Sequence, residues 1–85
     1  MIKIEITDIA ELQKLPIVSS YDLKHYLEQT YPELWGEALE LSYGAYGDVE
    51  EMLEYISRNA DTDNIHEVFM SLGAGLTATY GYIID

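Results

Sequence analysis

The chain has 85 residues, of which 48% are hydrophobic and 12% aromatic. A chain of this length supports one modest core, and its apolar content separates it from disordered sequences, so we expect a single α+β domain over residues 1–85. Sixteen Asp and Glu residues face four Lys and Arg residues, which gives a formal net charge of -12. Binding to DNA, RNA or anionic lipid needs basic residues that displace counterions, so this composition disfavours direct contact with nucleic acids or membrane surfaces.

The chain contains no cysteine, which excludes disulfides, thiolate metal sites and thiol nucleophiles. The first ten residues have neither the basic start nor the apolar run of a secretory signal. No stretch approaches the roughly 20 apolar residues that span a bilayer. We therefore expect a cytoplasmic protein.

The amino-terminal pattern predicts a strand followed by a short helix. Residues 2–6 alternate between isoleucine and polar residues, the period-two pattern of a strand with one buried face. Asp8 and Glu11 have the spacing of a capping box, and Pro16 prevents a helix from continuing. We expect a helix of two turns between them.

Two longer helices are predicted to follow almost without a connection. Ser19 and Ser20 are N-cap residues for a helix that ends near Gln29. Thr30, with Pro32 just inside, starts the next helix, whose apolar residues form one broad face.

The second of these helices is expected to end at Gly44 and Gly47. Asp48 and Glu51 repeat the capping box and open a further helix that ends near Arg58.

The carboxyl-terminal third predicts one more helix and one more strand. Asn64 and Glu67 can open a helix that Gly73 closes. Residues 76–84 form an alternating β-branched and aromatic run, which predicts a strand that pairs with the first one. The expected fold is α+β, with a two-stranded sheet from the N- and C-terminal strands packed with about four helices.

The sequence contains no pattern that predicts catalysis, a metal site or a cofactor. His25 and His66 each stand alone, without a second histidine at helical metal-binding spacing. The glycines of residues 44–47 and 73–75 lack phosphate-loop spacing, and residues 61–64 lack the glycine and distal glutamate of a calcium loop. We therefore expect a protein that is not an enzyme.

The carboxylates of the middle helices form two groups. Glu33, Glu37 and Glu40 recur at helical spacing opposite the apolar face, and we call them the acidic stripe, about 10 Å long. The next helix carries a second group, Glu50, Glu51 and Glu54, which we call the acidic cluster. Asp48 adds one more acid just before this cluster. Like charges one turn apart destabilise a helix by a few tenths of a kcal/mol, so helix stability does not explain the stripe.

Eight tyrosines accompany these acids, an unusual number for a chain of this length. We expect Tyr80 and Tyr82 to pack in the core, and Tyr43, Tyr46 and Tyr55 to be exposed beside the carboxylates. Tyrosine and carboxylate together suit an arginine-rich partner, through cation–π contacts and charged hydrogen bonds.

The function predicted from these features is inhibition of a basic protein. Rigid rows of carboxylates can imitate the phosphates of a duplex and occupy the basic cleft of a nucleic-acid-processing or host-defence protein. In composition the chain looks like the inhibitors that mobile elements such as phages carry against defence enzymes, of the anti-restriction or anti-CRISPR type. It also looks like immunity or antitoxin proteins that neutralise basic nucleases.

Two alternatives remain open at this point. The acidic residues can form an ordinary solvated helix surface in a chain that stays in solution by being acidic. A structural or adaptor subunit would instead assemble through apolar surface, such as the edge of residues 76–84 or an exposed Trp35, and pairing of two copies there would give a homodimer.

Overall fold

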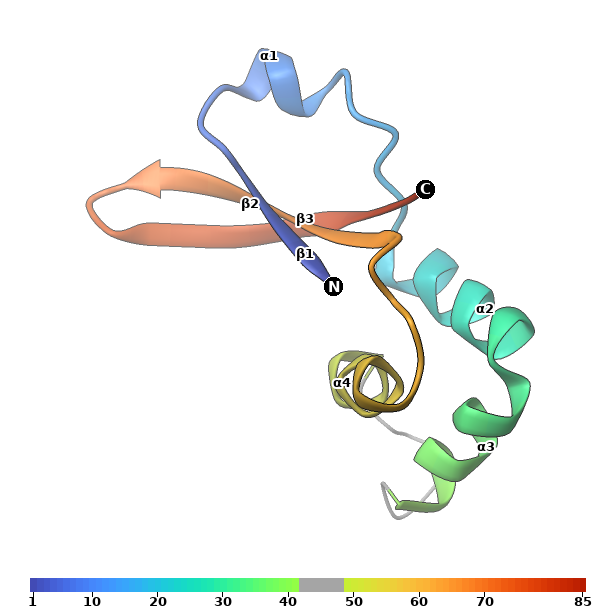
Figure 1. Ribbon diagram of the computed structural model, residues 1–85. Coiled ribbons are helices and arrows are strands. Elements are labelled where there is room, and N and C mark those ends of the chain that lie inside the picture. Colours follow the sequence, from blue (N-terminus) through green and yellow to red (C-terminus); the bar gives the residue numbers. More distant parts are fainter. Residues whose placement is uncertain (42–48) are drawn as a thin grey trace. The chain divides into compact units, whose positions relative to one another are not determined.

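The computed structural model describes residues 1–41 and 49–85 and has an α+β fold. Its elements follow one another in the order strand, four helices, two strands (Figure 1). Their bounds are β1 Ile2–Ile6, α1 Ile9–Leu12, α2 Ser20–Thr30, α3 Pro32–Leu41, α4 Val49–Asn59, β2 Ile65–Gly73 and β3 Leu76–Ile84.

The chain forms two compact units, which are described separately below. The sheet unit consists of residues 1–19 and 63–85, and the helical unit consists of residues 20–62. The prediction of one domain over residues 1–85 stays a prediction.

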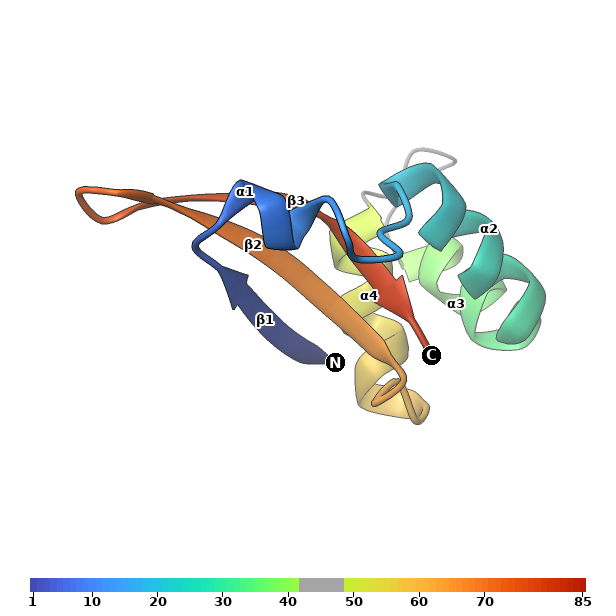
Figure 2. The same cartoon turned by 90° about the horizontal axis from the view of Figure 1, so that it is seen from above.

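The sheet unit has a three-stranded mixed sheet in the order β1-β2-β3 (Figures 1 and 2). β1 runs parallel to β2, with Ile2 opposite His66 and Ile6 opposite Met70. β2 and β3 form an antiparallel hairpin. Parallel neighbours need a long crossover connection, and residues 7–64 supply it.

The prediction of a two-stranded sheet was therefore wrong. The segment predicted as a helix from Asn64 to Gly73 contains β2, and β3 pairs with β2 instead of with β1. Ile65 and Val68 are three residues apart and fully buried, which imitates one face of a helix. In the strand these two side chains lie on opposite faces, because a central strand can be buried on both sides.

The hairpin turn explains why Gly73 does not cap a helix. Gly73, Ala74 and Gly75 have φ values of 81°, 52° and 77°, the left-handed region in which glycine is least strained. Three consecutive residues of this kind turn the chain from β2 directly into β3.

A short strap, Ile17 and Val18, runs along the far edge of β3. Val18 and Tyr82 exchange two backbone hydrogen bonds, with N–O distances of 2.7 Å and 3.0 Å. The neighbouring Gly81 gives the strap room, because a Cβ atom there would lie 2.7 Å from the carbonyl oxygen of Val18. Glycine is therefore required at position 81 by this close approach.

α1 is shorter than the predicted two turns. It covers Ile9–Leu12, and the side chain of its N-cap Asp8 accepts a hydrogen bond of 2.9 Å from the amide of Ala10. The predicted cap is therefore confirmed, and the helix ends four residues before Pro16.

The helical unit packs α2, α3 and α4 against one another. The predicted starts of α3 and α4 are confirmed to within about two residues, while the predicted end of α3 at Gly44 and Gly47 lies outside the described residues. The three helices bury one set of apolar side chains: Leu23, Leu27, Trp35, Ala38, Met52, Leu53 and Ile56.

A single residue, Tyr31, separates α2 from α3. Its amide donates to Leu27 O at 2.9 Å, and its carbonyl accepts from the amide of Trp35 at 2.8 Å, so it ends one helix and begins the next. Its hydroxyl donates to the carbonyl oxygen of Asp61 at 2.5 Å. Burial, with smaller contributions from Tyr26 and Asp61, raises the pKa of Tyr31 above its usual value.

The helices in the described part of the chain lack the length and the apolar character needed to cross a membrane.

Candidate acidic interface

The acidic stripe lies on the exposed side of α3. Glu33, Glu37 and Glu40 are all exposed, while Trp35 and Ala38 of the same helix are buried. Residues 33, 37 and 40 fall within one narrow sector of a helix with 3.6 residues per turn. The structure therefore places the predicted stripe on one continuous surface.

The acidic cluster lies on the exposed side of α4. Glu50, Glu51 and Glu54 are exposed, and the opposite side of the helix buries Met52 and Ile56. Acids in the first turn of α4, Glu50 and Glu51, also interact favourably with the positive end of the helix dipole.

A hydrogen bond joins the two acidic helices. The hydroxyl of Tyr55 on α4 donates to Oε2 of Glu37 on α3, and the O–O distance is 3.1 Å. This bond, followed by burial and the negative charge of Glu37, raises the pKa of Tyr55 above its usual value. Tyr55 was expected to be exposed, but it is half-buried.

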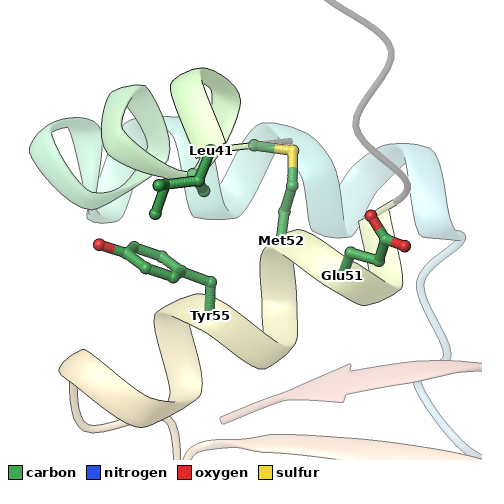
Figure 3. Close-up of a pocket in the computed structure, with 5 residues that line it drawn as sticks. Leu41, Glu51, Met52 and Tyr55 are labelled. Atoms are coloured by element: carbon green, nitrogen blue, oxygen red, sulfur yellow. The ribbon is translucent and has the colours of Figure 1, made fainter. Parts of the chain in front are cut away.

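A notch of about 170 Å³ lies beside this bond, between α3 and α4. Figure 3 shows Leu41 of α3 opposite the ring of Tyr55, while Met52 extends from α4 toward α3 and Glu51 stands on the preceding part of α4. Among the described residues, five line the notch: Ala38, Leu41, Glu51, Met52 and Tyr55.

Sequence reasoning missed the notch. The helix that starts at Thr30 was expected to have one broad apolar face, and this face includes Ala38 and Leu41. Leu41 is 59% exposed in the part of the chain that the structure describes. Only the packing of α3 on α4 brings these side chains together, and no local spacing in the sequence encodes that packing.

Basic residues neutralise little of this surface. Within the described parts of α3 and α4, Arg58 is the one basic residue, and it pairs with Glu54 at an N–O distance of 2.6 Å. Both side chains are about two-thirds exposed, so the pair contributes only about 0.3–0.5 kcal/mol.

Three of the predicted interface residues, Tyr43, Tyr46 and Asp48, lie outside the described residues. The stripe and the cluster lie on the exposed sides of two packed helices, and the half-buried Tyr55 joins these helices through its bond to Glu37.

The two histidines lie in separate units. His25 packs edge-to-face against Tyr21, with ring centroids 4.6 Å apart. His66 Nε2 lies 2.6 Å from Oδ2 of Asp85. Over residues 1–41 and 49–85, no group of three or more His, Asp and Glu side chains is arranged to hold a metal ion.

The sheet unit has a larger hollow, of about 350 Å³, lined by Lys3, Glu5, Phe69 and Thr77. The ammonium of Lys3 lies 5.7 Å from the centre of the Phe69 ring. Its two charged residues are of opposite sign, so the hollow has no net charge to attract a basic partner. The larger cavity is therefore not part of the acidic interface.

Comparison with known proteins finds no matching family model, no matching curated protein and no matching solved structure. The function is therefore inferred from the charges and contacts of this chain alone.

Proposed function

We propose that the protein is a non-enzymatic inhibitor that occupies the basic cleft of a nucleic-acid-processing or host-defence protein. One observation carries this proposal: the acidic stripe and the acidic cluster expose six glutamates on two packed helices. Arg58 is the one base on the described residues of those helices.

The spacing of these carboxylates supports imitation of nucleic acid. B-form DNA carries one charge per about 1.7 Å of its axis, and the stripe places three carboxylates along about 10 Å of α3. The charge density is lower than that of a duplex, but the helical backbone fixes the spacing of the Cα atoms, and the bond from Tyr55 holds the carboxylate of Glu37. Such a surface attracts a basic cleft over several ångströms, and salt screens that attraction.

The test is capture of partners from a cell lysate at low salt, followed by a salt step and mass spectrometry. The variant for this test replaces all six glutamates by glutamine, which keeps size and helix propensity but removes the charge. We expect wild type to retain a basic nuclease or nucleic-acid-binding protein that salt releases and that the variant does not bind. Equal retention by the variant would exclude electrostatic mimicry.

A matched pair of double variants separates local charge from total charge. Glu33→Gln with Glu40→Gln removes two charges from the stripe, and Glu5→Gln with Glu11→Gln removes two charges from the sheet unit. All four side chains are exposed. We expect the first pair to weaken binding roughly two- to thirtyfold, at about 0.2–1 kcal/mol per charge, and the second pair to have little effect.

An adaptor that assembles through apolar surface is the second candidate, because the hairpin exposes large apolar side chains. Leu72, Leu76 and Tyr80 are 55%, 63% and 49% exposed, so the expectation that Tyr80 packs in the core was wrong. Trp35 is only 5% exposed and cannot contribute to such a surface. Binding through the hairpin would survive high salt and would be lost in Leu76→Lys but retained by the six-glutamine variant.

A further inference from the structure

We infer that the notch between α3 and α4 receives one arginine side chain of the basic partner. This inference rests on the proposed function and specifies the chemical group that the acidic interface recognises. It depends on the size of the notch, on its apolar floor and on the charge at its rim.

The size of the notch fits a single side chain. Its volume is about 170 Å³, whereas sites for drug-sized ligands usually measure about 300–1,000 Å³. A small-molecule cofactor would therefore remain mostly outside it.

The floor of the notch suits an aliphatic stem. Ala38 and Met52 are almost completely buried, at 3% and 2% exposure, and present apolar atoms from the two helices. Leu41 forms the opposite wall and is 59% exposed, so a stem that covers it removes apolar surface from water.

The rim selects a cation over an apolar side chain. Glu51 lines the notch, and Glu37 accepts the hydrogen bond from Tyr55 beside it. An apolar occupant would desolvate Glu51 without a compensating partner, which is unfavourable. A cationic head group can instead pair with the carboxylate while its stem stays on the apolar floor.

The ring of Tyr55 favours arginine over lysine. The hydrogen bond to Glu37 fixes the hydroxyl end of the ring, and the ring lies across the notch from Leu41 (Figure 3). A planar guanidinium stacks on an aromatic face and binds a carboxylate through two parallel hydrogen bonds, whereas an ammonium does neither as well.

The experiment uses oligo-arginine and oligo-lysine peptides of equal length as probes. Binding is measured by calorimetry at several salt concentrations, and the methyl group of Met52 and the ring of Tyr55 are followed by NMR. We expect the arginine peptide to bind about two- to fivefold more tightly and to shift the Met52 and Tyr55 resonances.

Variants at the notch that keep all six glutamates are compared with one control that removes a single glutamate. Tyr55→Phe retains the ring and should retain the preference for arginine, whereas Tyr55→Leu should abolish it. Leu41→Lys places a cation at the notch and should also abolish the preference. Glu40→Gln makes the same change in net charge one residue away and should weaken binding of both peptides equally. Circular dichroism and thermal unfolding check that each variant is folded.

The outcomes separate this inference from the proposed function. Equal binding of both peptides with no shift at Met52, or an arginine preference that survives Tyr55→Leu in a folded protein, would overturn the arginine site and leave electrostatic binding intact. Peptide binding by the six-glutamine variant at wild-type affinity would instead overturn the proposed function.

Discussion

The helical unit holds ten of the sixteen acidic residues, whereas the sheet unit, of nearly equal length, holds six, and each unit has two of the four Lys and Arg residues. Exposed apolar residues are distributed in the opposite way. Of the eight large hydrophobic side chains that are exposed in the described chain, the sheet unit has six: Met1, Ile2, Ile9, Leu72, Leu76 and Tyr80.

This contrast shows that the two units favour different kinds of contact. Charged contacts weaken as salt rises, because screening shortens their range, while apolar contacts do not. The contrast also reflects backbone structure. Helices satisfy their own hydrogen bonds and leave their exposed side free for carboxylates, while the sheet has edges that a strap such as Ile17 and Val18 must cover.

The largest expected effect comes from the buried side of the helical unit. Ile56 on α4 is fully buried, so Ile56→Ala should destabilise this unit by about 2–5 kcal/mol through lost burial and a cavity. Leu41→Ala is the control, because Leu41 is 59% exposed and its truncation should cost much less. Urea denaturation monitored by circular dichroism measures both. Similar losses for both variants would show that Ile56 is not part of a packed core.

Two glycine-to-alanine substitutions, one in each unit, should change stability by an intermediate amount and in opposite directions. Gly81→Ala places a methyl group against the Val18 carbonyl and should destabilise the sheet unit by about 1–3 kcal/mol. Gly36→Ala, in the interior of α3 with no neighbour within 4 Å of the new methyl group, should stabilise the helical unit by about 0.5–1 kcal/mol. Amide exchange at Val18 and Tyr82 should accelerate only in Gly81→Ala, and unchanged exchange would contradict the role of the strap.

The smallest expected effect is on the titration of Tyr55. Its pKa is raised because the hydroxyl donates to Glu37, so Glu37→Gln should lower the pKa toward the usual value of about 10. Because the pKa of Tyr55 is higher in the folded chain than in the unfolded chain, the protonated hydroxyl stabilises the fold. This stabilisation is complete below the pKa of the unfolded chain and is lost as the pH rises through the pKa of the folded chain. NMR titration of the Tyr55 ring carbons measures the shift. An unchanged midpoint would show that the bond does not form in solution.

Local signals in the sequence were enough to predict most of the elements. Alternation identified β1 and β3, the capping box at Asp8 located α1, and proline early in the helix placed the start of α3. The acidic stripe was also predictable, because residues 33, 37 and 40 share a helix face whatever the helix packs against.

Features that depend on distant contacts were not predictable. β2 is the central strand, and its burial on both faces erased the alternation that marks a strand. The notch needs α3 and α4 to pack in one register, and the Tyr55–Glu37 bond spans eighteen positions in the chain. Helix periodicity predicts which residues share one face of a helix. It does not predict which other helix packs against that face.

The crossover between β1 and β2 also determines the order in which the sheet can be completed. The hairpin of β2 and β3 closes across two residues, 74–75, whereas pairing β1 with β2 must close the loop of residues 7–64. Closing a longer loop costs more conformational entropy, and a folded helical unit offsets part of that cost by shortening the span that remains flexible. The acidic surface can therefore be in place while β1 still has no partner strand in the sheet unit.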